Sequence, residues 1–122
     1  IECWENQFPG YEVEIILPEY TAICPRTGLP DFGTIHVTYI PDRWCLELKS
    51  LKEYINAYRN LGIFYENAVN RILRDLVAAC KPVTMTVRGE FSPRGGIRSQ
   101  VEARYQKPRA GGRQSGTGRR KR

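Results

Sequence analysis

The stretch Y-T-A-I-C-P-R-T-G-L-P-D-F, residues 20–32, carries a cysteine and an aspartate on one stiff segment, and the rest of the chain is arranged around it. Its two internal prolines each fix a backbone φ angle, and the Thr-Gly pair between them is a turn sequence. The segment between Cys24 and Asp31 is therefore expected to fold back on itself. A thiol and a carboxyl group on such a loop suit a nucleophile and its proton partner, although a buried cysteine beside a turn-capping aspartate is the commoner arrangement.

Strand patterns lie on both sides of this loop. Glu12–Leu17 is rich in β-branched residues and is expected to stop at Pro18, which cannot donate to a sheet ladder. Gly33–Ile40 alternates apolar and polar residues with period two. The same alternation predicts two further strands, at Val83–Arg88 and Ile97–Tyr105. A turn at Phe91–Gly96 would join them into a hairpin.

Two helices are expected between the second and third of these strands. Ser50 to about Asn60 opens on a capping-box pattern, in which Ser50 is followed three residues later by Glu53. Tyr65–Cys80 has apolar residues at helical spacing along one face. Trp44–Leu48, before the first helix, is expected to be a short link.

The order strand, strand, helix, helix, strand, strand predicts an α+β fold, with a four-stranded antiparallel sheet and both helices on one face. Such a sheet has two open edges and one helix-free face. Assembly into a larger sheet would cover these edges, so we expect an oligomer.

The positive charge of the chain lies almost entirely in its last residues. Of nineteen basic side chains, seven follow Gln106, where there is no acidic residue, which leaves twelve basic against thirteen acidic side chains in residues 1–106. We expect one domain over residues 1–106 and a disordered basic tail over 107–122, which is rich in Gly, Ser, Arg and Lys.

The cysteines and histidine do not form a metal-binding pattern. The chain has four cysteines without a C-x-x-C pair and one histidine, His36, so we expect no metal site and reduced thiols. The apolar runs are far shorter than the ~20 residues that cross a bilayer. We therefore expect a cytoplasmic protein without membrane contact.

Four separate stretches carry a resemblance to a known family: I-C-P-R-T-G-L-P-D-F at 23–32, E-L-K-S-L-K at 47–52, R-N-L-G-I-F-Y-E at 59–66 and F-S-P-R-G-G-I at 91–97. The chain resembles the NADPH-dependent 7-cyano-7-deazaguanine reductases, the nitrile reductases of queuosine biosynthesis, in their short single-domain form. The resemblance implies a tunnelling fold whose subunits form rings, with two pentamers face to face. It also implies active sites between subunits.

The resemblance implies roles for ten residues. Cys24 would add to the nitrile carbon and form a covalent thioimide, and Asp31 would donate a proton, so that two NADPH reduce the nitrile to 7-aminomethyl-7-deazaguanine. The implied substrate-binding residues are Leu46, Glu47, Leu48, Tyr65 and Glu66, and the implied NADPH-binding residues are Lys49, Lys52 and Arg94. Many members of the family have Ser in place of Leu48 and His in place of Tyr65.

Two other functions are open from the residues alone. A nitrilase or amidase-like hydrolase also uses a cysteine with a carboxylate and a lysine. A small RNA-binding module would use the basic tail, but the nearly neutral body lacks interleaved aromatic and basic residues, so no direct nucleic-acid contact is expected. A related GTP cyclohydrolase is disfavoured because zinc ligands are missing.

Overall fold

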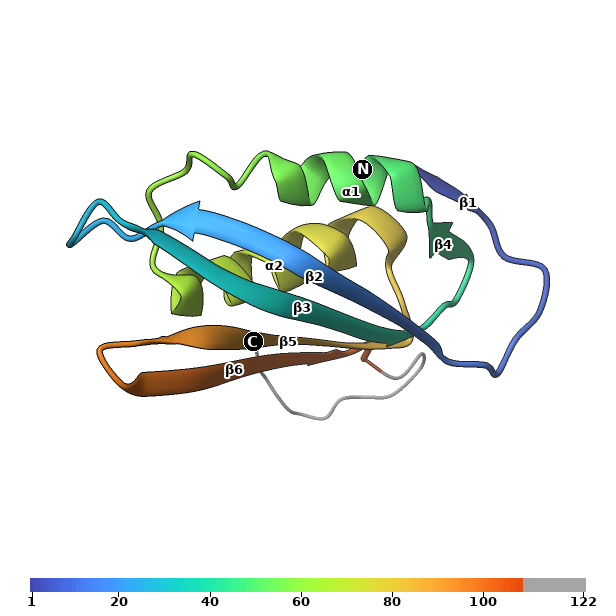
Figure 1. The fold of residues 1–122 in the computed structure, drawn as a ribbon. Coiled ribbons are helices and arrows are strands. Elements are labelled where there is room, and N and C mark those ends of the chain that lie inside the picture. Colours follow the sequence, from blue (N-terminus) through green and yellow to red (C-terminus); the bar gives the residue numbers. More distant parts are fainter. Residues whose placement is uncertain (109–122) are drawn as a thin grey trace.

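The computed structural model describes residues 1–108 and has the α+β fold that the sequence predicts (Figure 1). A four-stranded antiparallel sheet has the order β2-β3-β5-β6, and a small two-stranded ribbon pairs β1 with β4. The tail beyond residue 108 lies outside the described residues. The elements are β1 (Cys3–Glu5), β2 (Val13–Ile23), β3 (Pro30–Ile40), β4 (Trp44–Leu46), α1 (Leu48–Asn56), α2 (Tyr65–Cys80), β5 (Thr84–Arg94) and β6 (Ile97–Gln106).

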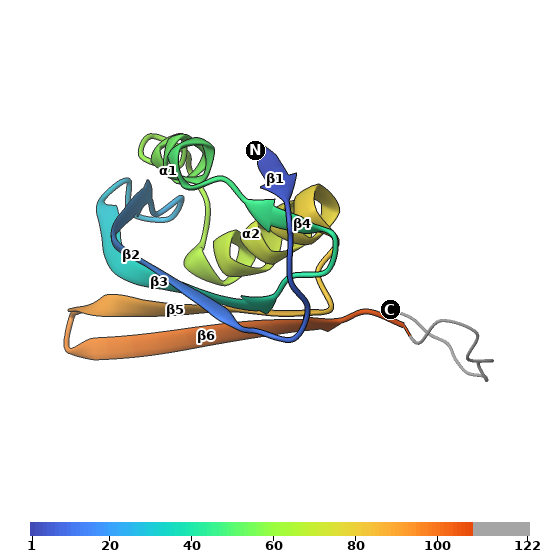
Figure 2. The same cartoon turned by 90° about the vertical axis from the view of Figure 1, so that its right-hand side faces the viewer.

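Both helices cover the same face of the sheet, which confirms the predicted two-layer arrangement (Figure 2). The apolar positions of the strands and of α2 meet in one core. Ile35 and Val37 of β3 and Val87 of β5 are buried there, beneath Ile72 and Leu76 of α2. The alternate residues of each strand face away from the helices. β2 and β6 form the two edges of the sheet.

The predicted end of the first strand at Pro18 is wrong, because β2 continues to Ile23. The register with β3 shifts between Leu17 and Tyr20, so Pro18 lies in a bulge of an edge strand. A proline is tolerated there because its missing N–H interrupts no central ladder. β3 likewise begins at Pro30, where the sequence predicted a loop, and pairs Asp31 with Ala22.

The first helix begins earlier than the capping-box pattern predicts. Glu47 is the N-cap residue, and its carboxylate accepts hydrogen bonds from the N–H groups of Lys49 and Ser50, each at 2.8 Å. The Ser50 hydroxyl instead accepts from the Glu2 N–H, which ties the N-terminal segment to α1. The Trp44–Leu46 part of the expected link is a strand paired with β1.

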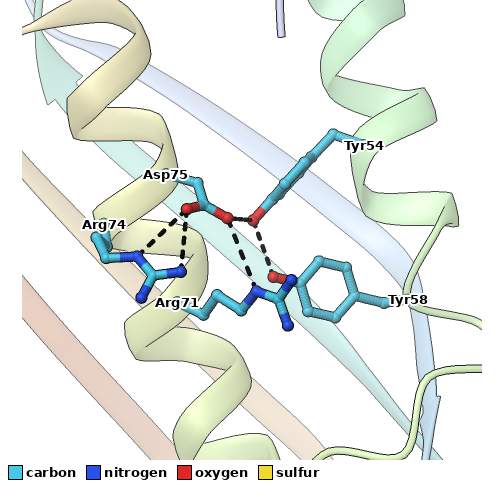
Figure 3. Close-up of polar contacts among 5 residues, drawn as sticks. All are labelled: Tyr54, Tyr58, Arg71, Arg74 and Asp75. Atoms are coloured by element: carbon cyan, nitrogen blue, oxygen red, sulfur yellow. Dashed lines mark hydrogen bonds and ion pairs between the residues drawn. The ribbon is translucent and has the colours of Figure 1, made fainter.

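A polar cluster joins the two helices (Figure 3). The Tyr54 hydroxyl of α1 donates to Asp75 Oδ2 of α2 at 2.6 Å and lies 2.8 Å from the Tyr58 hydroxyl. Arg71 and Arg74 approach the same carboxylate from α2. The cluster fixes α1 against α2, and the segment between these helices leads into the candidate site.

Candidate active site

Five of the ten residues implied by the resemblance line one cavity of about 240 Å³. They come from the β2–β3 turn, the first residues of β3, the start of α2 and the end of β5. The cavity is lined by Cys24, Asp31, Phe64, Tyr65, Glu66, Ser92, Arg94 and Ile97.

The Cys24 turn is closed by two backbone hydrogen bonds. The Cys24 N–H donates to the Leu29 carbonyl at 2.9 Å, and the Gly28 N–H donates to the Cys24 carbonyl at 2.8 Å. Gly28 has a φ of 72°, a conformation that side-chain-bearing residues rarely adopt. The predicted stiff turn therefore spans residues 24–29, and Asp31 follows on the first residues of β3.

The connection between the helices is fastened to this turn. The Ile23 N–H donates to the Leu61 carbonyl at 2.9 Å, and the Ile63 N–H donates back to the Ile23 carbonyl at 3.0 Å. This parallel bridge holds the chain just before α2 beside the residue that precedes Cys24. The first residues of α2, Tyr65 and Glu66, are thereby placed next to the thiol.

Hydrogen bonds lower the pKa of the Cys24 thiol below its ordinary value. The Thr27 hydroxyl contributes most, followed by the backbone N–H groups of Thr27 and Arg26; partial burial acts in the opposite direction, and the Arg94 guanidinium adds a smaller lowering. Donors directed at the sulfur stabilise the thiolate, which is the nucleophilic form of cysteine.

Asp31 forms an ion pair with Arg94. Arg94 Nη2 lies 3.1 Å from Asp31 Oδ1, and the Asp31 side chain is only 11% exposed. The ladder between β3 and β5 ends at Gly33 and Phe91, so the two hairpins separate beyond this point. The ion pair crosses this separation, next to a wider cleft of about 610 Å³ between the hairpins.

Tyr65 and Glu66 are presented differently at the start of α2. The Tyr65 ring stacks on the Phe91 ring, with centroids 4.2 Å apart and planes at 10°, and its hydroxyl donates to Ser99 Oγ at 3.0 Å. The Phe91 ring lies so close to Gly89 that a Cβ there would be 2.6 Å from it. Glu66 is exposed in the first turn of α2, where the helix dipole favours a carboxylate.

The other five predicted residues lie in and just before α1, and none lines the cavity. Leu46 is 2% exposed, and its backbone N–H donates to the Tyr39 hydroxyl. Glu47 is occupied by its capping role, and the N–H groups of Lys49 and Ser50 lower the pKa of its carboxyl group. Leu48, Lys49 and Lys52 are exposed.

Sequence reasoning missed three residues of this region. Thr27 was treated only as a turn residue, Phe91 as the start of a turn, and Ser99 as one position of a strand. The position of Thr27 three residues after a candidate nucleophile was the available signal. No sequence signal pointed to Phe91 or Ser99, because their contacts with Tyr65 depend on how α2 lies across the sheet.

The family model described as QueF-like protein matches residues 30–110. The chain belongs to the QueF-like protein family. A relative from Elusimicrobium minutum, named NADPH-dependent 7-cyano-7-deazaguanine reductase, is 59% identical over 108 residues, covering 88% of this chain and 82% of the relative. A relative of the same name from Chlorobaculum tepidum is 58% identical over 109 residues, covering 88% of this chain and 93% of the relative.

A solved structure has the same architecture as this QueF-like chain. The archaeosine synthase QueF-Like in the apo form matches with a TM-score of 0.74 at 23% identity, covering 80% of this chain and 96% of the other. This likeness concerns the fold alone, and it agrees with the predicted tunnelling fold. Among residues 1–108 there is no helix long and apolar enough to span a membrane.

Proposed function

We propose that this chain is an NADPH-dependent nitrile reductase that converts 7-cyano-7-deazaguanine to 7-aminomethyl-7-deazaguanine, in the biosynthesis of the modified tRNA nucleoside queuosine. The observation that carries the proposal is the single cavity holding the Cys24 thiol, the Asp31 carboxylate and the Glu66 carboxylate. The shared name of the two relatives, each at least 58% identical, supports the same reaction.

Cys24 acts as the nucleophile. Addition of the thiol across the nitrile breaks the S–H bond, forms a C–S bond and leaves an N–H on the former nitrile nitrogen, so a covalent thioimide results without a leaving group. The lowered pKa of Cys24 supports this role, because it increases the thiolate fraction near neutral pH.

Asp31 transfers the proton from sulfur to nitrogen: its carboxylate takes up the proton that leaves the Cys24 thiol and delivers it to the nitrile nitrogen as the C–S bond forms. Its carboxylate lines the same cavity as the thiol, which supports transfer to a nitrile held between them. Arg94 keeps this carboxylate oriented toward the turn at 3.1 Å.

Glu66 recognises the deazaguanine ring. An exposed carboxylate in the first turn of α2 can accept hydrogen bonds from the ring N–H and the exocyclic amine, as a guanine-like edge offers. The stacked Tyr65 ring forms a flat wall beside it. Glu47 and the backbones of Leu46 and Leu48 would complete recognition from α1, and Glu47 retains one free acceptor lone pair on each capping oxygen.

Lys49, Lys52 and Arg94 would hold NADPH. The two lysines are exposed one turn apart on α1, which suits paired phosphate groups, and Arg94 is 37% exposed. NADPH, when bound, supplies one hydride for each of the two reductions from nitrile to amine. With two protons, two hydrides account for the four hydrogens that the amine gains.

A ring assembly would bring the two halves of the site together. The five residues in and just before α1 do not line the Cys24 cavity, and β2 and β6 leave both sheet edges unpaired among the described residues. Both observations support a homo-oligomer, which we propose to be two pentamers in the cytoplasm. Native mass spectrometry of the full chain tests this: ten subunits are expected, and a monomer would contradict it.

Absorbance at 340 nm tests the reaction itself. The protein with NADPH and 7-cyano-7-deazaguanine should consume two NADPH per nitrile, and Cys24→Ala should consume none. Nitrile loss with release of ammonia and without NADPH consumption would assign the cavity to a cysteine hydrolase instead.

A further inference from the structure

The cleft of about 610 Å³ lies beside the Cys24 cavity, and none of the ten residues implied by the resemblance lines it. The two spaces adjoin at Ser92, which lines both. Successive side chains of a strand point to opposite faces, so Asp31 faces the Cys24 cavity and Phe32 faces the cleft. The first residues of β3 therefore form a wall of each space.

The Cys24 cavity is too small to hold both reactants of a reductase. Its volume of about 240 Å³ lies below the ~300–1,000 Å³ of ordinary small-molecule sites, and the nitrile ring would occupy much of it. Most of a dinucleotide such as NADPH then lies outside this cavity. The adjoining cleft has a volume within the ordinary range.

Two arginines line the cleft with free guanidinium groups. Arg59 lies in the connection between α1 and α2, and Arg98 lies in β6. Neither guanidinium group forms an ion pair or a side-chain hydrogen bond within residues 1–108. Of the two carboxylates in the same lining, that of Glu90 is already paired with Arg88, which leaves Glu19 as the one free carboxylate. The lining therefore has an excess of positive charge.

Packed residues hold the walls of the cleft in place. Tyr58, the neighbour of Arg59, is 3% exposed, and its ring packs against that of Tyr20 with centroids 6.0 Å apart. Tyr20 is itself a lining residue of the cleft. Between the hairpins, a Cβ at Gly33 would lie 2.6 Å from the Glu90 carbonyl oxygen, so β3 and β5 touch there. The cleft is thus built into the fold.

Phe32 gives the cleft a flat apolar wall, because 55% of the residue is exposed. An exposed aromatic ring is a surface on which a nucleobase can stack. The planar guanidinium group of arginine suits phosphate oxygens. An aromatic ring together with free guanidinium groups fits a nucleoside phosphate.

We propose that this cleft binds the adenosine 2′-phosphate half of NADPH, with Phe32 against the adenine ring and with Arg59 and Arg98 supplying positive charge to the 2′-phosphate group. The three basic residues proposed above for NADPH suit its paired phosphates, which leaves the 2′-phosphate without a partner. NADH lacks this group, so the two arginines determine the preference for NADPH. The inference rests on the proposed function, because it places the nicotinamide half at the Cys24 cavity.

Calorimetric titration of the full chain with adenosine 2′,5′-bisphosphate tests the site without turnover, and adenosine 5′-phosphate is the comparison ligand. The wild type should bind the bisphosphate more tightly. A double variant with Arg59→Gln and Arg98→Gln should lose about 10 to 100-fold in affinity for the bisphosphate, because charge-assisted hydrogen bonds are lost, and much less for the monophosphate. Phe32→Leu should weaken both nucleotides by similar factors.

Arg104→Gln is the matched control, since Arg104 lies on the same strand as Arg98 but outside the cleft, where it pairs with Glu102. This variant should bind both nucleotides like the wild type. An unchanged affinity for the bisphosphate in the double variant, or an equal loss for both nucleotides, would overturn the inference. Unchanged affinities in Phe32→Leu would contradict the position of the adenine ring.

Steady-state kinetics separate this inference from the proposed function. At saturating nitrile, the double variant should have a raised KM for NADPH and an unchanged KM for NADH. NADPH consumption with an unchanged preference for NADPH in the double variant would retain the reductase and reject the inference. Bisphosphate binding that depends on the two arginines, in a protein that does not reduce the nitrile, would retain the nucleotide site and reject the reductase.

Discussion

Arg94 Nη2 lies 3.1 Å from Asp31 Oδ1, across the point where the β2–β3 and β5–β6 hairpins separate. The resemblance implies that Arg94 binds the cofactor, but in the free protein its guanidinium holds the candidate proton donor and the Cys24 turn together. A cofactor phosphate that binds Arg94 would compete with Asp31 for the same group. With the proposed roles of these two residues, the ion pair would link cofactor binding to the proton donor within one chain.

Asp31→Asn should lower turnover by about 10² to 10⁴-fold, because the amide keeps the shape of the carboxyl group but cannot supply an acidic proton. NADPH consumption at saturating nitrile measures this. Asp42→Asn is the matched control, since Asp42 is also an aspartate paired with a basic residue, Lys107, outside the cavity. Equal turnover in Asp31→Asn and Asp42→Asn would remove Asp31 from the reaction.

Glu66→Gln should raise the KM for the nitrile about 10 to 100-fold, because hydrogen bonds to a charged acceptor contribute about 1.5–3 kcal/mol. The kcat value should change less than KM, since the role proposed for Glu66 is to bind the ring rather than the reacting carbon. Glu53→Gln, at an exposed position in the middle of α1, is the control and should leave KM unchanged. A normal KM in Glu66→Gln would show that the deazaguanine edge is recognised elsewhere.

Tyr54→Phe should destabilise the fold by about 1.5–3 kcal/mol, because the Asp75 carboxylate loses its 2.6 Å hydrogen bond from the Tyr54 hydroxyl. Tyr58→Phe loses a bond between two neutral hydroxyl groups, so about 0.5–1.5 kcal/mol is expected. Urea unfolding of the three proteins gives both differences. A larger loss in Tyr58→Phe than in Tyr54→Phe would contradict the arrangement in Figure 3.

The buried Cys80 thiol should make the protein less stable as the pH rises above ~9. Burial raises the pKa of Cys80 from 9.0 to about 12, so the folded state keeps a proton that the unfolded state has lost. The stability from this group is fully present below pH 9 and is lost between pH 9 and 12, by up to ~1.4 kcal/mol per pH unit. Burial raises the pKa of Tyr39 to about 12 as well, which adds a loss above pH 10.

Unfolding free energies at pH 8 and pH 10 measure this effect. Between pH 8 and pH 10, Cys80→Ala should lose less stability than the wild type. The variant should be less stable than the wild type at each pH, because the substitution leaves a small cavity. Parallel losses in the two proteins would show that the Cys80 thiol is not protected from ionisation by its burial.

The periodic parts of the fold could be predicted because they depend on local sequence. The apolar spacing of Tyr65–Cys80 gave the bounds of α2, and the alternation around Ile35 and Val37 gave the centre of β3. Pro18 was misjudged because a proline ends a central strand but not a bulged edge strand. Whether β2 lies at an edge depends on the whole sheet.

The candidate site was predictable only in part for a similar reason. Cys24 and Asp31 are close in sequence, so one turn brings them together. The pairing of Asp31 with Arg94 joins residues from two hairpins, and it depends on where those hairpins separate. Glu47 caps α1 through contacts that are local in sequence, with the N–H groups of Lys49 and Ser50. The capping-box pattern that begins at Ser50 was nevertheless the stronger signal, and it predicted the wrong N-cap residue.

A mass spectrum of the denatured protein after incubation with 7-cyano-7-deazaguanine, without NADPH, tests the central claim most directly. The proposed addition has no leaving group, so each chain should gain the full mass of one nitrile, mapped to the peptide that contains Cys24 and absent in Cys24→Ala. An unchanged mass, or an adduct on Cys3, Cys45 or Cys80, would contradict Cys24 as the attacking thiol.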